Sequence, residues 1–429
     1  MSASFVLRQA HVLDQGGGFS VPADVAVEDG RIVEVGPNIT AEGTRSLDAA
    51  GLWLMPGVFD CHAHPAMWSR DIVELLRTPI TAWALAASTT LGETLHAGVT
   101  FVRDAGGVDQ GLRMALERGD AAGPRLQLSI VLLTQTGGQM DGFLAGPGIE
   151  APISYLIPDY PGRPPYRVDG VDEMRRAVRA ILRAGADWIK IVAGSGPHVE
   201  GQDWDGVEFT AEEISTAVTE AARARRAVMC DVKTPEAIEM CVRAGARSIE
   251  HGLFLDEERA VLMAANDAWL VPTVSIYQDF TERADAGLLS PGMTQVVRDM
   301  VERSKDRVRI AIESGVRIAI GSDAFGREMH GNNLRELLHM HEAGMPATDV
   351  LLAATVGGAE LCGVAQEYGR IAPGYVFDAI VLEQDPSDLQ IFANRDSVKA
   401  VFKAGVLQTA HPRFLELMSP EEAGSDGYE

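Results

Sequence analysis

The chain has 429 residues, 46% of them hydrophobic and 23% charged, which is the balance of an ordinary soluble globular protein. Its formal net charge of −24 at pH 7 argues against a nucleic-acid or anionic-membrane partner, because both are bound through basic surfaces. The four cysteines lack C-x-x-C spacing, so they indicate neither a zinc ribbon nor a disulfide scaffold, and a cytoplasmic location is expected. Neither an export leader nor an apolar run of about 18 residues is expected in this sequence.

The two ends of the chain predict short strands separated by turns. Near the N-terminus the expected strands cover residues 5–7, 24–27 and 31–35, and near the C-terminus they cover residues 379–382 and 398–405. Glycine and asparagine turn signals at this spacing are typical of a small β-sandwich. We therefore predict one composite β domain from residues 1–54 and 371–415, followed by an acidic tail, residues 416–429, that we expect to be disordered.

Between these ends, residues 55–370 alternate strands with helices. This alternation predicts right-handed βαβ units and a (β/α)₈ TIM barrel. After a first strand within the apolar run that leads to His64, further strands are expected at 98–104, 125–133, 188–192, 227–231, 248–250, 269–274 and 317–321. Helical periodicity covers 171–184 and 234–244, and Thr210 is the predicted N-cap of another helix.

Polar residues stand at the ends of several of these strands. His62 and His64 are two residues apart, so a strand presents both imidazoles on one face, where they can bind one metal ion. Lys190, His251 and Asp323 also end short apolar runs, which is where a parallel barrel exposes its chemistry. Taken singly, these residues have structural alternatives. His62 and His64 could be an ordinary buried or surface pair, Lys190 could extend its charge to solvent, and Asp323 could cap a helix.

Taken together, these segments resemble the metal-dependent amidohydrolase superfamily over nearly the whole chain. The nearest branch is the imidazolonepropionase-like group, which includes prolidase-like and Xaa-Arg dipeptidases and an ochratoxin-hydrolysing carboxypeptidase. The segments that carry the resemblance are Met55-Pro56-Gly57, His62-Ala63-His64, Gly137-Gly138, Gly185-Ala186-Asp187, Ile189-Lys190, Ala244-Gly245, Ile249-Glu250-His251-Gly252, Gly321-Ser322-Asp323-Ala324 and Ala353-Ala354-Thr355.

The resemblance implies two divalent metal ions, zinc by expectation. His62, His64 and Asp323 would hold one ion, His251 would belong to the second, and an N-carboxylated Lys190 would bridge them. Metal-bound hydroxide would attack an amide-like bond, with Asp323 as the proton shuttle. The implied substrate is a small molecule: a dipeptide, an N-acyl amino acid or a xenobiotic amide, with a carbamate or urea as the competing class. A homo-oligomer is also implied.

One residue departs from the family pattern. Asp231 stands at the end of the fifth strand, where the family places a histidine that completes the second metal site. A carboxylate is a legitimate zinc ligand, although its side chain is shorter than imidazole. Four alternatives stay open: Asp231 ligates a second ion in altered geometry, the site holds one ion, the residue disables the enzyme, or it is a hydrogen-bonded carboxylate behind the ligands.

Three further residues are candidates for contact with substrate. Gln139 replaces a histidine that relatives often carry, His198 lies on the loop after the fourth strand, and His330 follows the eighth. For His198 and His330 an ordinary loop histidine is the alternative. Asp231 and Gln139 also leave room for a different class of function, a catalytically silent protein that keeps the barrel for binding or scaffolding. Metal content and turnover on a dipeptide panel would separate the two classes.

Overall fold

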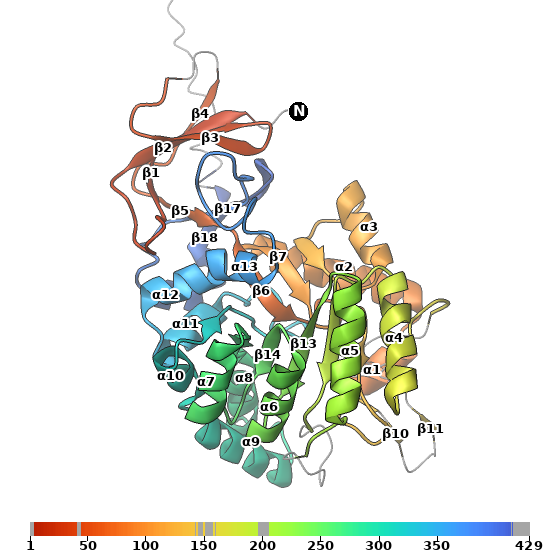
Figure 1. Ribbon diagram of the computed structural model, residues 1–429. Coiled ribbons are helices and arrows are strands. Elements are labelled where there is room, and N and C mark those ends of the chain that lie inside the picture. Colours follow the sequence, from red (N-terminus) through yellow and green to blue (C-terminus); the bar gives the residue numbers. More distant parts are fainter. Residues whose placement is uncertain are drawn as a thin grey trace, which may run out of the picture.

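The computed structural model describes residues 4–40, 44–141, 143–144, 149–150, 158, 160–195, 206–412 and 414. It consists of a helix-covered barrel and a smaller β domain, in which the red N-terminal strands lie beside the blue C-terminal ones (Figure 1). The predicted fold class is confirmed. The exact domain boundaries stay predictions, and residues 416–429 lie outside the described part of the chain.

Eight strand positions, parallel and in chain order, form the barrel. They are β6 (Val58–Ala63), β7 (Val99–Asp104), β8 (Arg125–Gln127) with β9 (Leu132–Leu133), β12 (Trp188–Val192), β13 (Ala227–Val232), β14 (Ser248–His251), β15 (Trp269–Val271) and β16 (Arg317–Ile318). The barrel closes where the Cys61 N–H donates to Ile320 O at 2.8 Å and the His64 N–H donates to Ala324 O at 3.0 Å. The predicted third strand is split into β8 and β9, and Ile130 between them has a left-handed φ of 68°.

Helices cover the outside of the barrel (Figure 1). They are α1 (Ile72–Arg77), α2 (Ile80–His96), α3 (Gln110–Arg118), α4 (Val171–Arg183), α5 (Ala211–Arg223), α6 (Pro235–Ala244), α7 (Glu257–Ala265), α8 (Val274–Asp285), α9 (Pro291–Ser304), α10 (Arg307–Glu313), α11 (Arg335–Glu342), α12 (Ala347–Leu352) and α13 (Gly358–Leu361). The predicted cap of α5 is present, because Thr210 and Glu213 form a reciprocal capping box. No helix in the described ranges has the length and apolar content that a membrane crossing requires.

The β domain combines strands from both ends of the chain. They are β1 (Phe5–Val12), β2 (Ala23–Glu28), β3 (Arg31–Gly36), β4 (Arg45–Asp48), β5 (Trp53–Pro56), β17 (Ala379–Leu382), β18 (Val398–Lys403) and β19 (Val406–Ala410). The first half of β1 pairs with β2 and β4, and its second half pairs with β5, which itself pairs with β17. The ring of Phe5, from the N-terminal end of the chain, packs against those of Phe377 and Phe402, from the C-terminal end, with ring centroids 5.3 to 5.5 Å apart. Strands β4 and β19 were not predicted.

The apolar stretch that leads to the histidines serves both domains. Residues up to Pro56 form β5 of the small domain, and β6 of the barrel begins at Val58. Between them, the Gly57 N–H donates to Asp378 O at 2.9 Å, and a Cβ on Gly57 would lie 2.1 Å from Thr100 Oγ1. Only glycine fits this crossing, which anchors the first barrel strand to the β domain.

Candidate functional site

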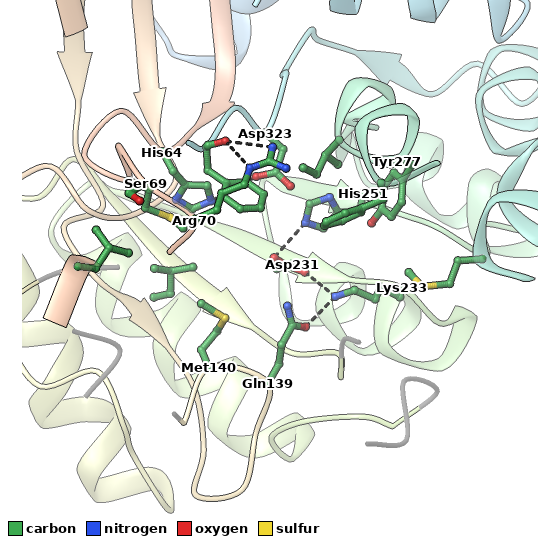
Figure 2. Close-up of a pocket in the computed structure, with 17 residues that line it drawn as sticks. His64, Ser69, Arg70, Gln139, Met140, Asp231, Lys233, His251, Tyr277 and Asp323 are labelled. Carbon is green, nitrogen blue, oxygen red and sulfur yellow. Dashed lines mark hydrogen bonds and ion pairs between the residues drawn. The ribbon is translucent and has the colours of Figure 1, made fainter. Parts of the chain in front are cut away.

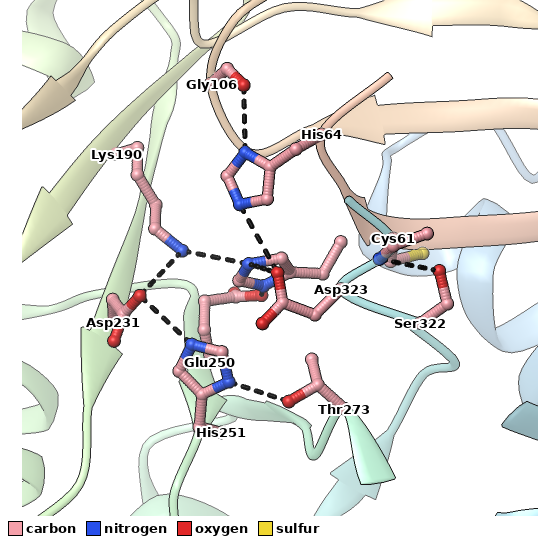
Figure 3. Close-up of polar contacts among 12 residues, drawn as sticks. Cys61, His64, Gly106, Lys190, Asp231, Glu250, His251, Thr273, Ser322 and Asp323 are labelled. Carbon is pink, nitrogen blue, oxygen red and sulfur yellow. Dashed lines mark hydrogen bonds and ion pairs between the residues drawn. The ribbon is translucent and has the colours of Figure 1, made fainter. Parts of the chain in front are cut away.

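Three predicted ligands come together where β6 and β16 end. Asp323 Oδ1 lies 3.6 Å from His62 Nε2 and 3.4 Å from His64 Nε2, and all three side chains are largely buried. The two histidines share one face of β6 and its extension, as the two-residue spacing predicts. Figure 3 shows His64 pointing toward Asp323 from the opposite side to Thr273 and His251.

Each imidazole is held through its Nδ1 atom. His62 Nδ1 donates to Glu250 Oε2 at 2.7 Å, His64 Nδ1 donates to Gly106 O at 2.9 Å, and His251 Nδ1 lies 2.6 Å from Thr273 Oγ1. The Nε2 atoms of all three rings therefore face the carboxylates of the site. Outer partners of this kind are what fix the tautomer and orientation of metal-binding histidines.

A buried ion pair lies behind His62. Arg103 Nη2 donates to both Glu250 oxygens at 2.8 and 2.9 Å, and both side chains are fully buried. Burial alone would raise the pKa of Glu250, but Arg103 and His62 lower it to about 2. Glu250 is therefore a carboxylate at neutral pH, and it keeps the proton of His62 on Nδ1.

A second carboxylate ties β6 to the segment that carries Asp323. Asp60 accepts hydrogen bonds from Ser322 N at 3.0 Å, Ser322 Oγ at 2.5 Å and Asn333 Nδ2 at 2.9 Å. Because Ser322 precedes Asp323 and Asp60 precedes the histidines on β6, this contact sets the distance between the predicted ligands. Buried polar groups that are fully paired in this way rigidify a site.

The other half of the site lies on β12, β13 and β14. Asp231 Oδ2 lies 3.0 Å from His251 Nε2 and 3.5 Å from Lys190 Nζ. Lys190 is fully buried, and its Nζ also lies 3.3 Å from His62 Nε2. Lys190 therefore stands between the two halves, and Asp231 takes part in the cluster despite its short side chain (Figure 3).

Three residues of the site have left-handed backbone conformations. The φ angles are 66° for His251, 50° for Thr273 and 51° for Asp323. Such angles cost of the order of 1–3 kcal/mol each for residues other than glycine, and they persist only where the surroundings enforce them. At His251 the turn has a visible effect: Glu250 and His251 are adjacent, yet both reach the same cluster instead of opposite faces of the strand.

Two charged or polar neighbours complete the second half. Lys233 Nζ lies 3.1 Å from Asp231 Oδ1 and donates to Gln139 Oε1 at 2.8 Å (Figure 2). Burial alone would raise the pKa of Asp231, but His251, Lys233 and Lys190 lower it well below its usual value. In the same way, His62, His64 and His251 outweigh burial and lower the pKa of Asp323. Both carboxylates are ionised at neutral pH.

The cluster opens into a pocket of about 260 Å³. Most of its lining is apolar, and its polar lining residues are His64, Ser69, Arg70, Gln139, Asp231, Lys233, His251 and Asp323 (Figure 2). The wall includes Met67, Leu75, Leu132, Met140, Ile276, Tyr277, Phe280, Met300 and Phe325. Pockets with apolar walls and a few convergent polar groups are typical of small-molecule sites.

The three predicted substrate contacts have different outcomes. Gln139 lines the pocket. His330 is buried, and it is not among the described residues that line the pocket; burial lowers its pKa to about 4, so the ring is neutral at pH 7. His198 lies outside the described residues. Contact of any of the three with substrate stays a prediction.

The donor atoms present fit a divalent cation. One ligand atom each from His62, His251 and Asp323 lies within 4.8 Å of the other two, and His64 Nε2 lies beside the same aspartate. Imidazole nitrogens and carboxylate oxygens are ordinary zinc ligands. The buried Nδ1 partners described above are the usual outer contacts of such ligands.

Three residues of the site, Lys233, Arg103 and Glu250, were not predicted to take part in it, although the sequence contained signals for them. Lys233 is two residues from Asp231, so strand alternation places both on one face. Arg103 and Glu250 are charged residues inside apolar strands, which is uncommon unless the charges pair. Their mutual contact, across 147 residues of chain, had no signal in the sequence.

A family model described as the amidohydrolase family matches residues 53–407. The chain belongs to the amidohydrolase family. The ochratoxinase of Aspergillus niger is 32% identical over 365 residues, which cover 82% of this chain and 75% of that protein. The crystal structure of a prolidase complexed with N-methylphosphonate-L-proline is 30% identical, with a TM-score of 0.86, and the match covers 95% of this chain and 100% of that one.

Another solved structure supports the same branch. A Xaa-Pro dipeptidase with methionine bound in its active site is 26% identical, with a TM-score of 0.83, over 94% of this chain and 99% of that one. The predicted prolidase- and ochratoxinase-like branch of the family is therefore confirmed. This amidohydrolase is a hydrolase that acts on carbon–nitrogen bonds.

Proposed function

We propose that this amidohydrolase cleaves an amide bond of a small molecule with the help of two divalent metal ions, zinc by the chemistry of the donors. The observation that carries the proposal is the cluster of His62, His251 and Asp323, whose ligand atoms lie within 4.8 Å of one another. His62, His64 and Asp323 would hold one ion, and His251 with Asp231 would hold the other. Imidazole and carboxylate groups in three- and four-ligand sets are typical of catalytic zinc.

Lys190 would join the two positions as an N-carboxylated side chain. Its Nζ is fully buried between His62 Nε2, at 3.3 Å, and Asp231 Oδ2, at 3.5 Å. A lysine that has added CO₂ ends in a carboxylate, which suits a position between two cations, whereas an ammonium would repel both. This placement supports the modification predicted from the family resemblance.

Two ions bound in such a site would lower the pKa of a water molecule and polarise the carbonyl of the substrate. Asp323 would accept one proton from that water as its oxygen attacks the carbonyl carbon. It would then deliver the proton to the amide nitrogen as the carbon–nitrogen bond breaks, so that one water is consumed per bond cleaved. The main-chain N–H of Asp323 donates to His62 O at 2.6 Å, and the adjacent Ser322 bonds to Asp60, so these contacts would keep Asp323 in position for both transfers.

The wall of the pocket favours a substrate with a bulky apolar group beside the scissile bond. Tyr277, Phe280 and Phe325 and several methionine and leucine side chains line it. An N-acyl amino acid or a dipeptide with an aromatic or large aliphatic side chain would bury this surface. Relatives named for the hydrolysis of ochratoxin and of proline peptides support the same class.

The test uses the purified full-length chain. Zinc content would be measured by elemental analysis, and hydrolysis would be followed on a panel of dipeptides and N-acyl amino acids that varies the apolar group. We expect close to two ions per chain, loss of activity after chelation, recovery on adding zinc, and faster hydrolysis of the bulky apolar members. Labelling with ¹³C-bicarbonate would give a carbamate signal in this chain that is absent from a Lys190→Gln variant.

Three results would contradict the proposal or a part of it. A chain that holds its metal but hydrolyses no member of the panel would favour a binding or scaffold protein. A chain that hydrolyses the panel equally well after complete removal of metal would keep the enzyme but exclude the proposed metal chemistry. A carbamate signal that persists in the Lys190→Gln variant would place the modification on another lysine.

A further inference from the structure

The two oxygens of Asp231 face different partners. Oδ2 points toward the cluster, 3.0 Å from His251 Nε2 and 3.5 Å from Lys190 Nζ. Oδ1 points away from it, toward Lys233 Nζ at 3.1 Å (Figure 2). The carboxylate is thus divided between a side that can reach a cation and a side that is already paired.

Lys233 is itself held in place. Its side chain is only 4% exposed, and its Nζ bonds to Asp231 Oδ1 and, at 2.8 Å, to Gln139 Oε1. The main-chain N–H of Gln139 in turn donates to the buried carboxylate of Glu208, which also accepts from Thr134 Oγ1 at 3.0 Å. A lysine fixed from two sides, and not free to swing into solvent, keeps its charge next to Asp231.

The arrangement has an electrostatic consequence. Lys233 and Asp231 are two residues apart at the end of β13, on one face of the strand, and carry opposite charges. In a buried site, a unit charge a few ångströms from a cation changes its binding strongly, because water screens it little. A lone carboxylate at this position would add a full negative charge to the site, whereas the pair adds almost none.

We propose that Lys233 is a positioning residue for Asp231. Its ammonium occupies Oδ1 and offsets the negative charge of the carboxylate. Only Oδ2 is then left for the cation beside His251, and the Asp231–Lys233 pair adds almost no net charge there. The inference rests on the proposed function, since it concerns the second metal position of the same site. In this chain Asp231, with its charge offset by Lys233, would therefore take the place of the neutral histidine that the family has at the end of the fifth strand.

The test measures zinc dissociation constants of the full-length chain by titration against a chelator, and needs no substrate. Lys233→Met removes the positive charge and should tighten zinc binding at the position beside His251 by about 10–100-fold. Asp231→His supplies a neutral ligand beside an uncompensated ammonium and should loosen that site by a similar factor. The double variant, Asp231→His with Lys233→Met, should return close to the unaltered chain.

A matched control removes a lysine from an ion pair elsewhere. Lys399 Nζ lies 3.1 Å from Glu383 in the β domain, so Lys399→Met should leave both dissociation constants unchanged. Unfolding curves recorded in excess chelator would show that each variant is folded. If one is not, Asp231→Asn and Lys233→Gln repeat the same changes in charge with smaller changes in shape.

Two results would overturn the inference. Weaker zinc binding by Lys233→Met would mean that Lys233 only orients Asp231, and equal binding by Asp231→His with and without Lys233 would mean that the two residues do not act as a unit. Failure of the proposed function looks different: the unaltered chain would then bind less than one zinc ion, or would bind zinc and hydrolyse no member of the panel.

Discussion

The two halves of the candidate metal site differ in the side chains that hold their candidate ligands in place. The half on β6 and β16 consists of His62, His64 and Asp323, and the two imidazoles are fixed by a carboxylate and a main-chain carbonyl. The half on β13 and β14 consists of Asp231 and His251, and Asp231 is held by the ammonium groups of Lys233 and Lys190. The first half is a set of imidazole rings around one carboxylate, whereas the second also contains two ammonium groups beside its carboxylate.

This difference indicates which residues of the site can be substituted without loss of the proposed metal binding. The Asp60 and Glu250 contacts that support the first half are buried, so a change at Glu250 leaves the charge of Arg103 uncompensated, and a change at Asp60 leaves buried donors of Ser322 and Asn333 unpaired. In the second half the charge of the candidate ligand Asp231 is balanced by Lys233, so that two changes can cancel. We therefore expect substitutions in the first half to be costly and those in the second half to be adjustable.

The largest effect is expected at Asp323, which serves the first half and the reaction together. Asp323→Asn keeps the shape but removes the carboxylate that carries the proton in the proposed mechanism, so kcat should fall by about 10³-fold or more. Metal content should be measured in parallel, because loss of activity with the metal retained is what assigns proton transfer to this residue. Asp299→Asn, on an exposed part of α9, is the control and should keep full activity. Near-normal turnover by Asp323→Asn would remove Asp323 from the proposed mechanism.

A smaller effect is expected from Glu250→Gln, which removes the charge that Arg103 and His62 share. The fully buried guanidinium of Arg103 then lacks a counter-charge, which should cost about 3 kcal/mol of unfolding free energy in urea. Zinc affinity should also fall by about 10–100-fold, because His62 loses its orienting partner. Glu313→Gln breaks an exposed pair with Arg309 and should leave the unfolding free energy nearly unchanged. Equal costs for the two variants would show that burial does not set the strength of the Glu250 contact.

The smallest effect concerns Glu208, which supports the second half through Gln139. Burial is the main cause that raises the pKa of Glu208 from 4.5 to about 7. Between these two values the folded chain binds more protons than the unfolded chain, so this contribution to stability is present below pH 4.5 and is lost as the pH rises through 7. We expect the unfolding free energy of the unaltered chain to fall by about 2 kcal/mol between pH 5 and 8, relative to Glu208→Gln. Parallel pH profiles for the two chains would show that Glu208 is not the group responsible.

Much of the first half was accessible from the sequence because it depends on local spacing. Strand alternation places His62 and His64 on one face, and parallel strands in chain order bring Lys190, His251 and Asp323 to the same end of the barrel. The same logic determined the barrel itself, since short apolar runs alternate with amphipathic helices over most of the chain. A composite β domain with strands from both ends of the chain was also predicted, although its strands β4 and β19 were not.

Other features depend on contacts between segments that are far apart in the chain. The left-handed turns at His251, Thr273 and Asp323 are enforced by packing and run against local preference. The split of the third strand and the crossing at Gly57 follow from neighbours that no spacing identifies.

The sequence alone determined the barrel, because it depends on periodicity, and the amidohydrolase resemblance, which supplied the candidate ligand residues. Only the tertiary structure decided that Asp231 reaches the cluster with one oxygen, that Lys233 holds the other, and that Arg103 and Glu250 stand behind His62. The physical reason is that the energy of a charge depends on its distance from other charges and from water. Those distances are set by the folded chain.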